Sequence, residues 1–204
     1  MSGFIPCREG SIINFPGSSI LKSCMLSEDA DIQGVFFGKD SVVGFDENGR
    51  LWRCRVSRDT VINNLHCKAW TEVEFSRDGT LIMCTVANET KIEGIPVMAG
   101  SMVLFHGNGN LFKCDIARDI IVEGYPLKSG TDVCFSESGM ISAFNLSEDA
   151  LIAGLPCMSG TRVWFYNNCK IAGCTVSDDI EIQGTLIREG TSVFFREDGK
   201  LVNV

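Results

Sequence analysis

Apolar residues recur along the chain at a fixed interval of thirty positions. The clearest column is phenylalanine, at Phe15, Phe45, Phe75, Phe105, Phe135, Phe165 and Phe195. Such a period is typical of tandem repeats in which each unit buries its apolar face against its neighbours. The repeats cover residues 5–34, 35–64, 65–94, 95–124, 125–154 and 155–184, followed by a partial repeat, 185–204. We expect residues 1–204 to form a single elongated repeat domain.

The apolar columns predict strands. Four further columns, which begin at Ile13, Leu21, Leu26 and Ile32, stay apolar wherever they recur. β-Branched and aromatic residues dominate them, and Val-x-Phe alternates with a period of two, as in strands that bury one face. Because no segment shows ten residues of helical periodicity, the sequence predicts an all-β protein.

Two kinds of turn separate the predicted strands. DENG, SRDG and REDG place a glycine at one column, at Gly49, Gly79 and Gly199. A glycine there closes a three-residue hairpin with a bulge, which would pair Phe45 with Leu51 and Phe75 with Leu81. Two-residue turns are expected at Gln33-Gly34, Glu93-Gly94, Glu123-Gly124, Ala153-Gly154 and Gln183-Gly184.

Two architectures fit this pattern: a β-solenoid with one coil per repeat, and a run of stacked antiparallel hairpins. An acidic column, at Asp29, Asp59, Glu89, Asp119, Asp149 and Asp179, bears on the choice. In a parallel solenoid these carboxylates would lie about 4.8 Å apart and repel one another. Hairpins place other strands between them, so we favour hairpins. An incomplete seventh repeat also argues against a closed propeller.

The repeat follows L-[SA]-x-D-x-x-I-x-G-x-P-x-x-x-G-[ST]-x-V-x-F-x-x-x-G-x-L-x-x-C, and GIPVMAGSMVLFHGNGNLFKC, from Gly94 to Cys114, matches it best. This pattern resembles tandem β-repeats of uncharacterised bacterial proteins and is loosely similar to the MORN hairpin repeats, whose period is shorter. The resemblance implies a hairpin array with a scaffold role, and it carries over no catalytic residue.

Composition narrows the classes of partner. A net charge of −8 and a pI near 4.8 argue against nucleic acid and against anionic membrane surfaces. No apolar run approaches the roughly 20 residues that span a bilayer. The N-terminus lacks a basic region followed by an apolar stretch, so we see no signal peptide, although a secreted mature fragment would look the same.

The ten cysteines raise the question of metal ligation or disulfides. Five share a column, at Cys24, Cys54, Cys84, Cys114 and Cys174, and neighbours within it could be close enough for a disulfide ladder. Repeat five carries Phe144 there, which a core accepts and a metal site does not. Cys7, Cys67 and Cys157 share a second column with apolar residues. We interpret these cysteines as unpaired core residues, which favours a reducing, cytoplasmic location and no bound metal.

Other candidate chemistry has a structural interpretation that we prefer. The acidic column could bind calcium, but dense Asp-x-Asp spacing occurs only at Asp29-x-Asp31. We expect each aspartate to hydrogen-bond the backbone of its own turn.

Adjacent acids such as Glu148 and Asp149 are expected in solvated turns and not as a glycosidase pair. Neither His66 nor His106 belongs to a nucleophile–base constellation, so we expect no enzyme activity and no cofactor. The Ser/Thr column that begins at Ser11 is expected to bond turns.

A partner is expected where the repeats differ. Two variable columns should face each other on the sheet: one holds Asn14, Gly44, Glu74, Leu104, Cys134, Trp164 and Phe194, and the other holds Lys22, Trp52, Ile82, Phe112, Ser142, Ala172 and Val202. Trp52, Leu104, Phe112, Trp164 and Phe194 would make an apolar strip, which commonly marks an interface. The alternative is a second core layer, covered by the other half of each repeat.

The junction of repeats two and three is also irregular. Asn64 replaces glycine, His66 replaces proline and Trp70 replaces glycine, with Phe36 nearby. This predicts a groove or a kink that could bind a partner, unless the repeats have simply drifted.

The sequence thus favours a non-catalytic scaffold that binds a protein or self-associates. The alternative is a carbohydrate-binding or carbohydrate-active surface β-solenoid that stacks sugars on its aromatic residues. We do not expect a small-molecule ligand.

Overall fold

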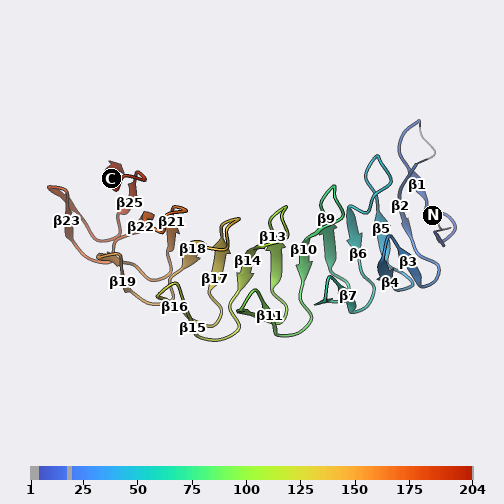
Figure 1. Ribbon diagram of the computed structural model, residues 1–204, viewed down its shortest axis with the longest axis horizontal. Coiled ribbons are helices and arrows are strands. Elements are labelled where there is room, and N and C mark those ends of the chain that lie inside the picture. Colours follow the sequence, from blue (N-terminus) through green and yellow to red (C-terminus); the bar gives the residue numbers. More distant parts are fainter. Residues whose placement is uncertain (1–4, 18–19, 204) are drawn as a thin grey trace. The chain divides into compact units, whose positions relative to one another are not determined.

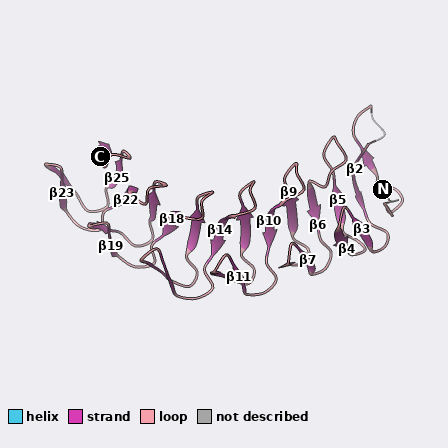
Figure 2. Ribbon diagram, in the orientation of Figure 1, coloured by secondary structure: helices cyan, strands magenta, loops and turns pink. Residues whose placement is uncertain are grey.

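The computed structural model describes residues 5–17 and 20–203, which form 26 strands and no helix (Figure 1, Figure 2). The chain divides into two compact units, Met1–Leu111 and Phe112–Val204. Each unit contains a main sheet and a row of small two-stranded hairpins. The prediction of an all-β array of hairpins is therefore confirmed.

In the first unit, the main-sheet strands follow chain order. They are β1 (Ile13–Asn14), β2 (Leu21–Met25), β5 (Val42–Gly44), β6 (Arg53–Arg55), β9 (Glu72–Phe75), β10 (Leu81–Thr85) and β13 (Met102–Phe105). The small hairpins are β3–β4 (Ala30–Ile32, Val35–Phe37), β7–β8 (Thr60–Ile62, Leu65–Cys67) and β11–β12 (Thr90–Ile92, Ile95–Val97).

The second unit repeats this plan. Its main-sheet strands are β14 (Leu111–Asp115), which begins at the last residue of the first unit, β17 (Asp132–Phe135), β18 (Ile141–Asn145), β21 (Arg162–Phe165), β22 (Ile171–Thr175), β25 (Ser192–Phe195) and β26 (Leu201–Asn203). Its small hairpins are β15–β16 (Ile120–Val122, Tyr125–Leu127), β19–β20 (Ala150–Ile152, Leu155–Cys157) and β23–β24 (Ile180–Ile182, Thr185–Ile187).

The small hairpins connect neighbouring strands of the main sheet. The chain leaves the sheet after β2, forms the hairpin β3–β4 and returns as β5, which pairs antiparallel with β2. The other repeats follow the same path, for example from β18 through β19–β20 to β21. Antiparallel pairing within each repeat agrees with stacked hairpins and not with the one-coil-per-repeat solenoid.

Both predicted turns form. Gly49 has a φ of 75°, and its N–H bonds the Asp46 carbonyl, which closes the hairpin that brings Phe45 opposite Leu51. In the two-residue turns both residues have positive φ, for example Gln33 at 55° and Gly34 at 82°. Turns of this kind match the right-handed twist of short hairpins, so their repetition fixes the register of each small hairpin.

Each core lies between the main sheet and the small hairpins. The predicted apolar columns supply it: Val43, Val73, Val133 and Val163 are fully buried. In the second unit the small hairpin contributes Tyr125, whose ring centroid lies 4.9 Å from that of Phe165 and 5.8 Å from that of Phe144. Ile13 is an exception, because its edge strand leaves it exposed.

The prediction that the cysteines of the two columns are unpaired is wrong for Cys7 and Cys24. Cys7 and Cys24 form a disulfide, with their Cα atoms 5.7 Å apart. The bond joins the two cysteine columns within one repeat and does not run along a single column as a ladder would. The other eight cysteines are free thiols, and all except Cys169 are buried, as a core role requires.

The acidic column bonds a different turn from the one predicted. Asp29, Asp149 and Asp179 accept the backbone N–H groups of Lys39, Ser159 and Glu189, each ten residues further along the chain. Each carboxylate therefore ties the loop that opens a small hairpin to the loop that follows it. The Ser/Thr column bonds turns as expected, since the Thr71 and Thr161 hydroxyls donate to carbonyls three residues earlier.

Candidate functional site

The candidate site lies on the outer face of the main sheets, which is the face opposite the core. In the first unit this face carries Trp52, Arg53, Glu74, Ile82 and Leu104; in the second unit it carries Phe112, Cys134, Trp164, Gly173 and Phe194. Trp52, Trp164 and Phe194 are 50%, 37% and 44% exposed. The small hairpins pack on the other face, so the alternative in which they cover this strip is wrong.

The two variable columns pair across the strands with a register that is one residue away from the predicted one. Glu74 pairs with Met83, not with Ile82, because the strand bulges between Leu81 and Met83. The same shift pairs Trp164 with Gly173. A β-bulge places two successive residues opposite one partner, so both project on the outer face. The outer face therefore carries three columns of side chains where the sequence predicted two.

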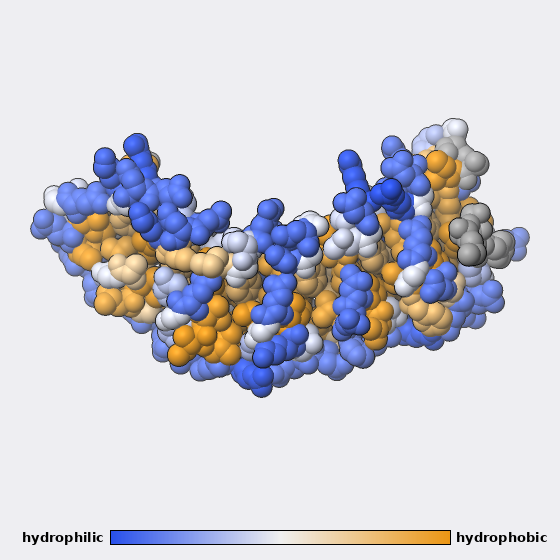
Figure 3. Space-filling view, viewed as in Figure 1, coloured by the Kyte–Doolittle hydropathy of each residue, from blue (hydrophilic) through white to orange (hydrophobic). Residues whose placement is uncertain are grey.

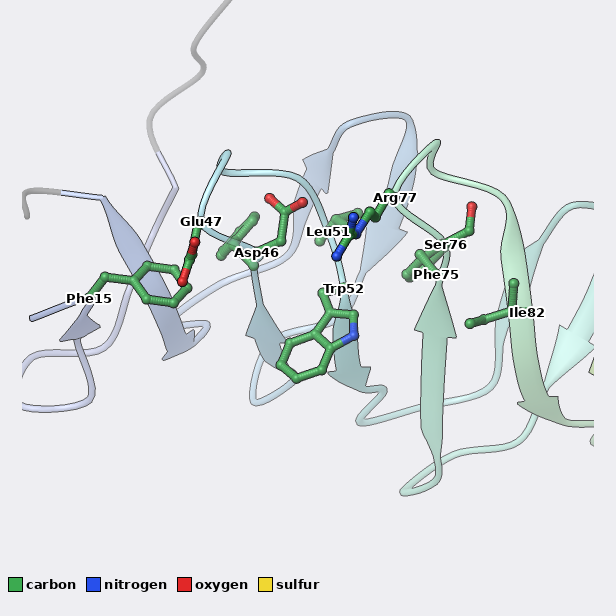
Figure 4. A pocket seen from close by; sticks show the side chains of 10 residues that line it. Phe15, Asp46, Glu47, Leu51, Trp52, Phe75, Ser76, Arg77 and Ile82 are labelled. Carbon is green, nitrogen blue, oxygen red and sulfur yellow. The ribbon is translucent and has the colours of Figure 1, made fainter. Parts of the chain in front are cut away.

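In the first unit, the groove around Trp52 is a hollow of about 450 Å³ at the turn end of the hairpins. Its lining consists of Phe15, Phe45, Asp46, Glu47, Leu51, Trp52, Phe75, Ser76, Arg77 and Ile82. Figure 4 shows Trp52 between Phe15 and Ile82, close to the turns that carry Asp46 and Arg77. Apolar side chains dominate the lining, and charges of both signs stand at its rim.

Cations already occupy positions over two of the aromatic rings. The Arg53 guanidinium lies 5.6 Å from the centroid of the Trp52 ring, and Arg53 also forms an ion pair with Glu74. Lys22 places its ammonium 5.8 Å from the centroid of the Phe15 ring. These contacts hold the rings in place at the surface through cation–π attraction.

The Asp46 carboxylate belongs to the turn. It accepts the backbone N–H groups of Arg50 and Asn48, both at 2.9 Å. The bond from Arg50 is the main reason that the pKa of Asp46 lies below its ordinary value. A carboxylate held ionised in this way serves the hairpin and is a poor general acid.

In the second unit, Trp164 and Phe194 meet in front of Gly173. Their ring centroids are 5.9 Å apart, in a tilted arrangement. The three residues pair in one row across β21, β22 and β25. Phe112 and Leu104 are only half-buried and contribute less exposed surface. The predicted strip is thus concentrated at the Trp52 groove in one unit and at the Trp164–Phe194 pair in the other.

The junction of repeats two and three keeps the regular backbone. Asn64 has a φ of 64° and Trp70 a φ of 61°, so both preserve the conformation of the glycines that they replace. Trp70 is 62% exposed, and His66 is exposed opposite Val61. A second hollow, of about 340 Å³, includes Asn63 and Asn64 in its lining. The junction therefore adjoins a groove, and its strand pairing shows no kink.

Sequence reasoning missed one further apolar surface, on the solvent side of the small hairpins. In the second unit, Ile121 is 76% exposed and Leu151 73% exposed. Figure 3 shows apolar surface where β15 lies in Figure 1. The signal was the column of middle residues in the first strand of each small hairpin. It holds Val61, Ile121 and Leu151 among the charged residues Asp31, Lys91 and Glu181.

Among the described residues, no group of three histidine, cysteine or acidic side chains is placed to hold a metal ion. The described residues also include no helix with the length and apolar character needed to cross a bilayer. No protein-family model matches the chain, and no curated protein matches it. The resemblance to MORN-like repeats therefore stays a prediction.

Proposed function

We propose that this protein is a non-catalytic repeat scaffold that binds a polypeptide partner in the groove around Trp52. The observation that carries the proposal is a half-exposed tryptophan in a mostly apolar hollow, held there by Arg53. Tryptophan is enriched at the centres of protein interfaces because it buries a large area with little loss of conformational freedom. Glu47 and Arg77 at the rim offer charges that can orient a peptide.

Carbohydrate binding is the second candidate, because exposed aromatic rings flanked by carboxylates also suit sugars. The arrangement of the rings favours a peptide over a sugar. Arg53 lies over Trp52 and Lys22 over Phe15, so each ring has less free face on which a sugar could stack. Asp46, the nearest carboxylate in sequence to Phe45, is already engaged by its own turn.

Self-association is a third candidate, and the exposed apolar pair Trp164–Phe194 of the second unit supports it. The predicted cytoplasmic location rested on unpaired thiols, and the Cys7–Cys24 disulfide weakens that argument. Location thus stays a prediction, and the proposal concerns only what the groove binds.

The test measures the binding of a random peptide library and of a glycan array to three proteins: wild type, Trp52→Ala and Ile121→Ala. Ile121 is an equally apolar, exposed control in the second unit. Peptides captured by wild type and Ile121→Ala but lost by folded Trp52→Ala would support the proposal. Glycans with that same profile would favour the second candidate instead. If neither library is captured and light scattering shows a dimer that Trp52→Ala disrupts, the surface serves self-association.

A further inference from the structure

Six of the ten cysteines occur as pairs seventeen residues apart, at Cys7 and Cys24, Cys67 and Cys84, and Cys157 and Cys174. The first pair is a disulfide. In each pair the first cysteine belongs to the column of the small hairpins and the second to a central strand of the main sheet. Wherever the first column holds cysteine, the second column does too.

The backbone surroundings of the three pairs are equivalent. Cys7 bridges to Leu26, Cys67 to Val86 and Cys157 to Val176, and each of these partners lies two residues after the second cysteine of its pair. This shared register gives the two later pairs the same strand relationship as the pair that is already bonded. All four of the later cysteines are fully buried in the core.

The two thiols of each later pair influence one another's pKa. The neighbouring Cys84 thiol lowers the pKa of Cys67, and the Cys67 thiol together with burial raises the pKa of Cys84. Cys174 has the same effect on Cys157. Each later pair thus consists of two neighbouring thiols, which is the arrangement that thiol–disulfide exchange requires.

The chain also supplies its own comparison residues. Cys54 and Cys114 occupy the second column, but Phe37 and Val97 stand at the first-column positions of their repeats. Burial raises the pKa of each of these two thiols to about 12. They share the core surroundings of Cys84 and Cys174 without a cysteine across from them.

We propose that Cys67–Cys84 and Cys157–Cys174 are disulfide sites equivalent to Cys7–Cys24, so that the oxidised protein carries three bonds from small hairpin to main sheet. The oxidant would be a low-molecular-weight disulfide such as oxidised glutathione. One thiolate attacks it, forms a mixed disulfide and releases one thiol; the second thiolate then displaces the other. Each pair loses two protons and two electrons, and the oxidant is reduced to two thiols.

The experiment uses the full chain, reduced and then refolded in a glutathione redox buffer. Remaining thiols are alkylated in denaturant, and the digest is read by mass spectrometry without reduction. We expect linked peptides for all three pairs, with Cys54 and Cys114 alkylated. Alkylation of Cys67, Cys84, Cys157 and Cys174 to the same extent as Cys54 would overturn the proposal. Links from these four to Cys134 or Cys169 would overturn it as well.

Two variants test whether the links form between the proposed cysteines. Cys67→Val copies Val97 of the next repeat, so it should fold, leave Cys84 alkylated and keep the Cys157–Cys174 link. Cys54→Ser is the control and should leave all three links intact. Oxidation should raise the Tm of wild type by roughly 5–10 °C per added bond, and Cys67→Val should lack one such increment. An unchanged Tm on oxidation of both proteins would contradict the proposed cross-links.

Discussion

Phe194 packs directly over Gly173, and its Cδ1 atom lies 2.6 Å from the point where a Cβ of residue 173 would stand. The Val193 carbonyl oxygen lies 3.0 Å from the same point. A side chain at this position would have to displace both a ring and the backbone. The absence of a Cβ therefore lets Phe194 reach Trp164 across the intervening strand.

This relationship predicts that Gly173→Ala destabilises the protein by roughly 1–3 kcal/mol, in the range of an overpacked site. Urea unfolding would measure the change. Part of the cost should vanish in Phe194→Ala, because the ring is then absent and only the Val193 carbonyl crowds the new Cβ. An equal cost of Gly173→Ala in both backgrounds would show that the ring does not set the requirement for glycine.

A polar side chain fastens the two-residue turn to the main sheet at Gln33, Glu93, Glu123 and Gln183. The Gln183 amide donates to the Gly199 carbonyl at 2.8 Å and accepts the Leu201 N–H at 3.2 Å. Gln183→Ala should cost about 1 kcal/mol, since Ala153 already adopts the same left-handed backbone and adds no strain. Gln183→Glu is the matched control: Glu93 accepts the corresponding Leu111 N–H, so this variant should keep that bond. Equal losses in both variants would argue against the bond to Leu201.

Trp70 occupies a left-handed conformation that glycine adopts at the same column in Gly100 and Gly130. Trp70→Gly should therefore raise the free energy of unfolding by about 1 kcal/mol. Trp70→Ala retains the Cβ at the same φ and should bring no such gain, which separates backbone strain from loss of the ring. Thermal melting of the three proteins would test this. A destabilised Trp70→Gly would mean that contacts of the indole outweigh the strain.

Acid should weaken the turns held by the aspartate column. The Ser159 N–H bond to Asp149 holds the pKa of Asp149 below its ordinary 3.8. The folded state thus favours the ionised carboxylate, and its stabilisation is complete above that ordinary pKa. It is lost as the pH falls through the lower pKa of the folded protein.

The variant that tests this pH dependence is Asp149→Asn. Glu148→Gln is the control for the loss of an adjacent negative charge. Below about pH 4, the Tm difference between wild type and Asp149→Asn should shrink as the pH is lowered. A difference that stays constant from neutral to acid pH would mean that the ionised carboxylate adds nothing to the turn.

Repetition made much of the fold predictable. Apolar columns such as Val43 and Phe45 identified the core, and Gly49 and Gln33-Gly34 marked the turns that shape both hairpins. The bulge was not readable, because Ile82 and Met83 are both apolar and either could face Glu74. A shift of one residue in a strand changes which side chains meet without changing the composition of the columns.

The candidate site was only partly predictable. Trp52 and Trp164 stood out as departures from the repeat, but the groove depends on turn residues such as Glu47 and Arg77, whose approach comes from the stacking of hairpins. The cysteine pairs carried a readable signal, a spacing of seventeen residues that occurs three times. This signal relates one column to the other and does not show within either column alone.

The central claim is that the groove around Trp52 binds a polypeptide. The most direct test is a fluorescence anisotropy titration of a labelled peptide selected on the wild-type protein. The account predicts at least about tenfold weaker binding to Trp52→Ala, with Ile121→Ala unchanged and both variants folded by circular dichroism. Equal affinity for wild type and folded Trp52→Ala would contradict it.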